Sequence, residues 1–203
     1  LKSYDPAFAY ELAVIVREGI HRMYEKQENL FYYLTIYNET YPMAAMPDTP
    51  GIEEGILQGM YCYRRSELAG ADRPKAHLLG SGPILLEALA AQELLAEAGV
   101  AADVWSVTSY NELFREAQAV ARWNRLHPAA APRTPYVARL LAGERGVFVA
   151  ASDYMRALPN SIAPWLPGPM QVLGTDGYGL SESRPALRGY FEVSAEHIAA
   201  TAL

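Results

Sequence analysis

The sequence predicts an α/β protein with a largely parallel sheet flanked by helices. Three observations support this prediction: short apolar runs of strand length, helical patterns between them, and turns rich in glycine or proline at their boundaries. From residue 76 onward these segments alternate as strand and helix. Such alternation is typical of units in which a helix joins each strand to the next parallel strand.

The composition supports a folded chain and argues against several functional classes. The 203 residues are 51% hydrophobic and 20% charged, which is the balance of an ordinary globular protein. The 17 basic and 23 acidic residues give a net charge of −6 without any basic block, so we expect no nucleic-acid partner. No apolar run reaches the roughly 18 residues of a membrane span, so we expect no membrane partner. The single Cys62 excludes an internal disulfide and favours a cytoplasmic location.

The N-terminal part predicts one helix, one strand and a long loop. Asp5 is a favourable N-cap and Pro6 a favourable first helical residue, and apolar residues then recur at helical spacing as far as Met23. Residues 30–37 are aromatic and β-branched without polar alternation, which predicts a strand covered on both faces. Residues 38–55 lose this periodicity and contain three prolines and two glycines, so we expect an ordered loop.

The remaining chain predicts four strands and five helices. The expected strands cover 76–79, 103–108, 147–151 and 170–173, and the expected helices cover 84–98, 111–125, 153–163, 184–191 and 194–203. Ser109 and Asn111 are both candidates for the N-cap of the second of these helices. Residues 70–74 are the best candidate for a linker, so we expect one domain at 1–69 and another at 75–203.

No complete catalytic apparatus is evident from the residues themselves. None of the four histidines lies at metal-ligand spacing from another histidine, a cysteine or a glutamate, so a metal site is not supported. Gly80-Ser81-Gly82 lies between a strand and a helix, but Leu85 stands where a dinucleotide-binding motif has its third glycine. We therefore expect a tight turn that needs small residues.

Two loops occupy positions where function is common in this class of fold. Both follow predicted strands, and ligands of α/β sheets bind beyond the carboxyl ends of strands. The prolines, methionines and tyrosines of the first loop also suit a subunit interface, and the alternative is a domain-crossing loop packed on its own protein. The second loop could contact a ligand or a neighbouring subunit, and the alternative is a structural crossover in which Ser183 caps the next helix. The candidate loop or interface residues are Asn38, Glu39, Tyr41 and Met43 in the first loop and Asp176, Tyr178, Ser181 and Arg184 in the second.

Several segments together resemble the homodimeric bacterial pyruvate dehydrogenase component, the thiamine diphosphate-dependent decarboxylating subunit of the pyruvate dehydrogenase complex. The similarity follows the family's order over essentially the whole chain. The segments that carry it are SYDPAFAYE at 3–11, YNETYPMAAMP at 37–47, EEGI at 53–56, LLGSG at 78–82, SVTSYNEL at 106–113, RWNRLHP at 122–128, and residues 172–184.

The resemblance implies an architecture and an activity. Residues 1–69 would form the end of a pyrimidine-binding α/β domain, and residues 75–203 nearly all of a transketolase-type C-terminal domain. The parent enzyme would decarboxylate pyruvate and acetylate lipoyl groups, using thiamine diphosphate and Mg²⁺ in the cytoplasm. The implied partners are a second copy of the enzyme and the dihydrolipoyl acetyltransferase of the complex.

The departures from the family pattern limit what can be transferred. The family's Gly-Asp-Gly motif with a downstream Asn-Asn pair, which holds the cofactor's diphosphate and Mg²⁺, does not occur in this sequence. We therefore transfer no catalytic, cofactor-binding or metal-binding residue, and we expect no cofactor in this chain alone. The expected role is that of an inactive C-terminal fragment that completes the fold and the dimer.

Two other interpretations stay open from the sequence. The chain can be a free-standing, non-catalytic binding or docking module with the transketolase C-terminal fold. It can also be a fragment of another transketolase-superfamily enzyme, although residues 38–47 and 122–128 argue against this.

Overall fold

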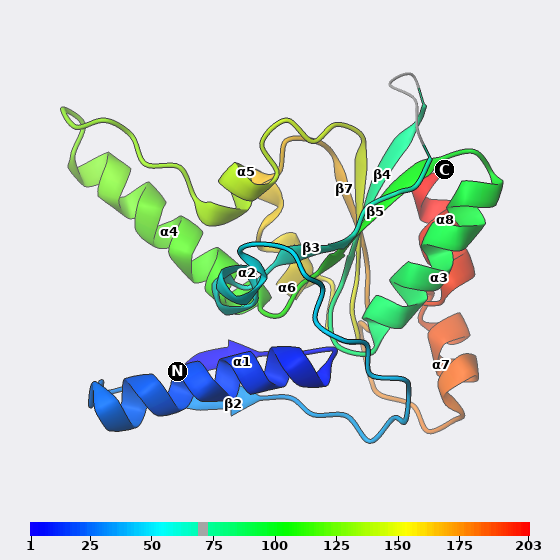
Figure 1. Cartoon of the computed structure of the whole chain (residues 1–203). Coiled ribbons are helices and arrows are strands. Elements are labelled where there is room, and N and C mark those ends of the chain that lie inside the picture. Colours follow the sequence, from blue (N-terminus) through cyan, green and yellow to red (C-terminus); the bar gives the residue numbers. More distant parts are fainter. Residues whose placement is uncertain (69–72) are drawn as a thin grey trace.

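The computed structural model describes residues 1–68 and 73–203, so residues 70–72 of the expected linker lie outside the described part. A small two-stranded sheet with one long helix lies against one end of a five-stranded sheet (Figure 1). Helices cover both faces of the larger sheet. No helix in the described ranges has both the length and the apolar character to cross a membrane.

The N-terminal unit consists of two parallel strands and a helix that continues into a π-helical turn. The strands are β1 (Lys2–Tyr4) and β2 (Tyr32–Leu34), the helix is α1 (Ala9–Ile20), and the π-helical turn η1 spans His21–Glu25. A second helix, α2 (Ile52–Gln58), packs against α1. Ile15 and Ile56 are fully buried in the core that these elements share.

The first helix begins later than the sequence predicts. Its N-cap is Phe8, so the expected N-cap role of Asp5 is wrong. The carboxylate of Glu11 closes this end of the helix, because it accepts the backbone N–H groups of Ala7 (2.5 Å) and Phe8 (3.1 Å). The Asp5 carboxylate is buried instead and accepts the Tyr37 hydroxyl at 2.6 Å. Asp5, which the local sequence favours as a helix N-cap, thus binds Tyr37, a residue distant in sequence.

The first predicted strand is also shorter and more exposed than expected. Only Tyr32–Leu34 form β2, and the side chains of Phe31 and Tyr33 are 62% and 60% exposed. The expectation that residues 30–37 are covered on both faces is therefore wrong for the described chain. The side chains of Phe31 and Tyr33 are exposed on the face that a second layer would cover in a buried parallel strand.

The five-stranded sheet has the order β3-β5-β4-β6-β7. Neighbouring strands are parallel except that β3 runs antiparallel to β5, which confirms a largely parallel sheet. The bounds are β3 Tyr61–Arg64, β4 Lys75–Gly80, β5 Ala101–Ser106, β6 Val147–Ala151 and β7 Met170–Leu173. The sequence analysis missed β3, which lies before the expected linker and yet pairs within this sheet. The division at 70–74 stays a prediction.

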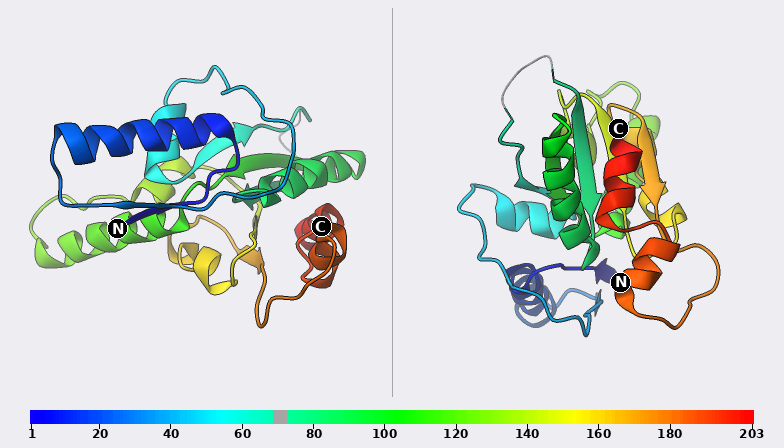
Figure 2. Two further views of the ribbon diagram at one scale, coloured as in Figure 1. Left: turned by 90° about the horizontal axis from the view of Figure 1, so that it is seen from below. Right: turned by 90° about the vertical axis from the view of Figure 1, so that its right-hand side faces the viewer.

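Helices cover the two faces of this sheet in separate groups (Figure 2). One face carries α3 (Ile84–Glu97) and α8 (Ala195–Ala202), which pack against each other. The other face carries α4, α5, α6 and the 3₁₀ turn η2. The remaining helix, α7, lies next to α8 on the side of α3 (Figure 1). The bounds of these elements are α4 Tyr110–Leu126, α5 Tyr136–Leu140, α6 Ala157–Asn160, η2 Ala163–Trp165 and α7 Arg184–Tyr190.

Most expected elements of this part are confirmed, and the deviations are local. The expected helix 153–163 is reduced to α6 followed by η2, and the helices α2 and α5 were missed. Ser109 rather than Asn111 caps α4, because its hydroxyl accepts the Glu112 N–H at 3.0 Å. Ser183 occupies the N-cap position of α7, but its side chain makes no capping hydrogen bond.

The turn between β4 and α3 requires small residues, as expected. Gly82 has φ +51°, in the left-handed region that glycine adopts at little cost. A Cβ on Gly80 would stand 2.7 Å from the Cα of Leu85, so the strand and the helix could not approach as closely. The turn lies against the N-terminal unit, because the Gly82 N–H donates to the Asp5 carbonyl at 3.2 Å. The carboxyl ends of β4 and β5 therefore face that unit.

Candidate functional site

The two loops singled out in the sequence meet through the guanidinium groups of α7. Nη2 of Arg184 donates to Oδ1 of Asn38 at 2.6 Å. Nη2 of Arg188 donates to Oε2 of Glu39 at 2.7 Å, and its Nη1 donates to Oε1 of Glu87 on α3 at 3.0 Å. Three segments far apart in sequence are thereby joined by charge-assisted hydrogen bonds.

A cavity of about 360 Å³ lies between these loops and α7. Its walls are mostly apolar and aromatic, and a few charged groups converge on it, which is the usual make-up of a small-molecule site. The apolar and aromatic lining comes from Tyr37, Tyr178, Leu180, Leu187, Phe191 and Val193, and the charged lining from Glu39, Asp153, Arg184 and Arg188.

Asp153 is the unusual charged group of this cavity. It follows β6 at the carboxyl end of the sheet and is half-buried. Within residues 1–68 and 73–203, its carboxylate accepts no hydrogen bond and forms no ion pair. Burial raises the pKa of Asp153 to about 6, and the positive charge of Arg188 opposes this rise only in part. An acid with so high a pKa in a cavity marks a candidate functional group.

Four of the eight predicted residues line the cavity: Asn38, Glu39, Tyr178 and Arg184. Three of these are held by hydrogen bonds or ion pairs across the junction. Tyr178 differs, because its side chain is 94% exposed at the rim.

The other four predicted residues lie outside the cavity lining. The Tyr41 hydroxyl donates to the Ala7 carbonyl and fastens the first loop to the N-terminal unit. Asp176 accepts Nε of Arg156 at 2.6 Å, which fastens the second loop to the turn before α6. Met43 and Ser181 are exposed. Their interface roles stay predictions.

Sequence reasoning missed Asp153 and Arg188. A signal for Asp153 was present, since it is an acid placed just after a buried strand, where ligands of such sheets bind. Arg188 gave no such signal, because an arginine on a short helix is ordinary in sequence. Only the approach of Glu39 and Glu87 shows its bridging position.

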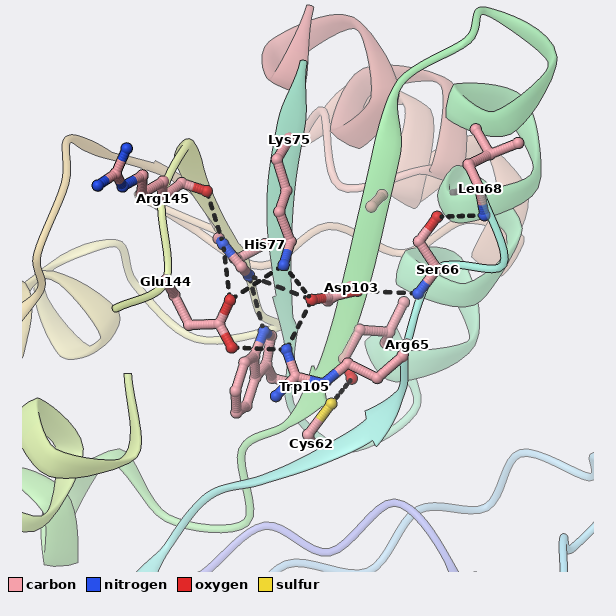
Figure 3. Close-up of polar contacts among 12 residues, drawn as sticks. Cys62, Arg65, Ser66, Leu68, Lys75, His77, Asp103, Trp105, Glu144 and Arg145 are labelled. Carbon is pink, nitrogen blue, oxygen red and sulfur yellow. Dashed lines mark hydrogen bonds and ion pairs between the residues drawn. The ribbon is translucent and has the colours of Figure 1, made fainter. Parts of the chain in front are cut away.

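A second cluster of charged groups lies at the opposite, amino end of the sheet (Figure 3). Asp103 on β5 accepts Nη1 of Arg65 at 2.7 Å and the N–H of Ser66 at 2.8 Å, and lies 3.0 Å from Nζ of Lys75. Glu144 accepts the same two cationic groups, at 2.6 and 3.0 Å. Burial alone would raise the pKa of both carboxyls, but the hydrogen bonds from the cations leave both pKa values below their usual range.

His77 completes this amino-end cluster as a buried neutral ring. Burial lowers its pKa, and Nε1–H of Trp105 points to its Nδ1 at 3.3 Å. Its Nε2 therefore carries the proton and donates to the Arg145 carbonyl at 3.0 Å. His77, Asp103 and Glu144 offer ligand atoms within 4.8 Å of one another. They do not fit Mg²⁺, because an ammonium and a guanidinium already bind the carboxylates and Mg²⁺ prefers oxygen ligands and water.

The comparisons with known proteins agree with this architecture. Residues 59–194 match the transketolase-like TK C-terminal domain, so the chain belongs to that family. Residues 1–44 match the pyruvate dehydrogenase E1 component middle domain. The order of the two matches follows the order of the two sheets along the chain.

The more specific similarity is to the C-terminal part of pyruvate dehydrogenase E1 components, which confirms the resemblance found in the sequence. The chain is 48% identical to that protein of Pseudomonas aeruginosa, over 100% of this chain and 23% of the relative. It is also 48% identical to that of Escherichia coli K12, over 99% of this chain and 22% of the relative. The chain thus spans less than a quarter of the length of these relatives.

Transketolases are among the solved structures that share this fold. The transketolase of Pichia stipitis superposes with a TM-score of 0.66 at 14% identity, over 98% of this chain and 24% of that one. A split-gene transketolase, described as an inactive beta4 tetramer, gives 0.62 at 16% identity, over 99% of this chain and 56% of that one. Identities this low show the fold alone, and they confirm the expected C-terminal-domain architecture.

Proposed function

We propose that this chain acts as the C-terminal part of a longer pyruvate dehydrogenase E1 component. The observation that supports the proposal most strongly is the 48% identity that continues through both domain matches, from the first strand to the last helix. The whole enzyme would work in the cytoplasm. It would decarboxylate pyruvate and acetylate the lipoyl groups of a dihydrolipoyl acetyltransferase.

The implied cofactors are thiamine diphosphate and Mg²⁺, and the described residues do not fit them. Thiamine diphosphate, when bound, supplies the electron sink that decarboxylation needs. A diphosphate would meet the unpaired carboxylate of Asp153 in the cavity between the loops, where Arg184 and Arg188 are already engaged. The amino-end cluster is filled by Lys75. We therefore assign no cofactor contact and no chemical step to this chain.

The role we propose for this chain is assembly. The exposed aromatic side chains are those of Phe31, just before β2, and Tyr33, within it, and Val16 and Ile20 leave further apolar surface exposed on α1. We infer that the remainder of the middle domain covers the face at β2. The two loops, with the eight residues predicted for them, would pack against other parts of the enzyme or against its second copy.

An immunoblot of the native source, with an antibody raised against this chain, tests the proposal. We expect a band several-fold heavier than 22.4 kDa, since the relatives are more than four times as long. The material captured by that antibody should reduce an artificial electron acceptor when pyruvate, thiamine diphosphate and Mg²⁺ are added. A serum depleted of the specific antibody is the control.

A band at 22.4 kDa, without pyruvate-dependent activity, would contradict the proposal. That outcome would favour the free-standing docking module. A heavy band with activity on a sugar phosphate instead of pyruvate would favour the interpretation that the chain is a fragment of another transketolase-superfamily enzyme.

A further inference from the structure

The cavity between the two loops and α7 contains one acidic side chain that forms no hydrogen bond or ion pair with residues 1–68 or 73–203. Glu39 and Glu87 share Arg188 at 2.7 and 3.0 Å, and Arg184 adds a second positive charge 3.6 Å from Glu39. These four charges cancel. Asp153, which has no hydrogen bond or ion pair within the described residues, leaves the cavity with a net charge of about −1 at neutral pH.

Aromatic rings accompany this carboxylate. Tyr37, Tyr178 and Phe191 line the cavity, together with aliphatic side chains of the second loop and α7. Tyr178 is almost fully exposed, with no hydrogen bond in the described part of the chain, so its ring can close over a ligand. Aromatic rings around a carboxylate are the chemistry that recognises organic ammonium groups, because the ring faces are negative and the alkyl parts need an apolar wall.

Other ligand classes fit this cavity less well. An anion would stand beside Asp153 and find both guanidinium groups already bonded to Asn38, Glu39 and Glu87. A divalent metal ion would require several oxygen ligands, and most of the lining is hydrocarbon. An organic cation neutralises the charge and also uses the apolar walls. The volume of about 360 Å³ admits a group of the size of a lysine side chain.

We propose that the cavity between residues 37–39, 175–180 and α7 binds an organic ammonium group on an aliphatic stem. The ammonium would lie against Asp153, and the stem would lie along Leu187 and Phe191. The same chemistry can come from a free amine or from a lysine side chain of a protein. The inference rests on the proposed assembly role leaving this cavity open, because the same two loops form it. It is separate from the proposed activity, because it uses no cofactor and no reaction.

The charges around Asp153 predict the pH dependence of binding. The negative charges of Asp5, Glu39 and Glu87 favour its protonated form, and Arg188 favours its ionised form. The pKa of Asp153 is about 6 without ligand, and a bound cation would lower it. Affinity for an ammonium should therefore be high above pH 7 and fall as the pH drops through 6.

Isothermal titration calorimetry on the full protein that carries this chain tests the site. The probes are choline and its neutral isostere 3,3-dimethylbutanol, and also n-butylammonium and N-acetyl-lysine methylamide. We expect saturable binding of the cations and at least about tenfold weaker binding of the neutral isostere. Stronger binding of the lysine amide than of n-butylammonium would indicate a protein-borne lysine, and the reverse order would indicate a free amine.

Two variants locate the binding. D153N should weaken cation binding at least about tenfold at pH 7.5, and Tyr178→Ala a few-fold, since an exposed cation–π contact is weaker than a charge. D48N, at an exposed position outside the cavity, is the matched control and should bind as the unsubstituted protein does. Circular dichroism and thermal melting establish that each variant is folded.

Three results would overturn the proposal. They are the absence of saturable binding by any of the cations, equal binding of choline and its neutral isostere, and full binding by a folded D153N protein. None of them depends on pyruvate turnover, so failure of this site and failure of the proposed function are distinguishable.

Discussion

The two ends of the five-stranded sheet carry similar residue types with opposite electrostatic outcomes. At the amino end, Asp103 and Glu144 each bind Arg65 and Lys75, and both carboxyl pKa values are lowered. At the carboxyl end, Asp153 has no partner in the described ranges and its pKa is raised to about 6. An acidic side chain at a sheet end has a structural role when lysine or arginine side chains of the protein bind it. It is a candidate binding group when they do not.

The difference also shows why proximity of ligand-type residues is weak evidence for a site. His77, Asp103 and Glu144 form the tighter cluster. Each side-chain nitrogen or oxygen of these three residues already has a hydrogen-bond partner in the protein. The carboxyl-end cavity also has two acids, Glu39 and Asp153, but Asp153 has no hydrogen bond or ion pair in the described part of the chain and lies among apolar walls. A polar side chain without a partner is available to a ligand, whereas a dense cluster of paired side chains is not.

The largest expected effect is at the amino end. Asp103→Ala removes the side chain that joins Arg65, Lys75 and the Ser66 N–H, so it should lower the free energy of unfolding by about 3 kcal/mol. This figure is at the lower end of the range for buried pairs, because Arg65 and Lys75 are partly exposed and water replaces part of the loss. Urea denaturation measures it. A loss no greater than that of D48A would show that the network adds nothing.

The next effect is at the junction of the loops. Arg188→Ala leaves Glu39 and Glu87 mostly buried without their shared cation, which should cost about 2 kcal/mol. Amide hydrogen exchange in residues 38–47 should become faster, since the loop loses its bond to α7. Arg184→Ala is the control and should cost less, because the Arg184 side chain is 49% exposed. Equal losses in the two variants would disprove the bridging role.

A stabilising effect is expected at Asp153. The folded-state pKa is about 6, above the unfolded value of 3.8, so the ionised carboxylate costs stability as the pH rises through this window. D153N removes that cost and should raise the free energy of unfolding by about 2 kcal/mol at pH 8, less than the ~3 kcal/mol of the full shift because the side chain is only half-buried. The gain should shrink as the pH falls from 6 and vanish below about pH 3, where Asp153 is protonated in both states. Urea denaturation as a function of pH shows whether the gain follows this course; a pH-independent gain would exclude the electrostatic cause.

The smallest effect is expected at Asp176. It pairs with Arg156 on the surface of the second loop, where water screens the charges. D176N should leave the urea midpoint unchanged within error, in contrast to Asp103→Ala. A clear loss of stability would mean that the second loop is anchored through this pair and that its shape depends on it.

Much of the fold was accessible from local sequence patterns. The strands at 147–151 and 170–173 have the predicted bounds, and α3 buries the predicted face of Ile84, Ala88, Ala91 and Leu95. These elements combine strong periodicity with clear end signals. The short elements β3, α2 and α5 were missed, because segments of four to seven residues have too few positions to show a period.

The candidate site was accessible only in part. Both loops were identified, because each follows a strand, and four of the eight named residues line the cavity. Their meeting through Arg184 and Arg188 could not be predicted, since residues 38 and 184 are brought together only by tertiary packing. The exposed aromatic face of β2 was also unexpected, because an apolar strand in sequence does not reveal which of its faces a given chain covers.

The sequence by itself determined the alternation of strands and helices, the small-residue turn at Gly80–Gly82 and the family resemblance. These depend on residues close together along the chain, where hydrophobic period, turn chemistry and motif spacing act directly. The tertiary structure alone decided that Asp5 is buried rather than a helix cap and that Asp103 is neutralised while Asp153 is not. Desolvation and ion pairing depend on which distant groups fill the space around a side chain, and only the packed chain sets those neighbours.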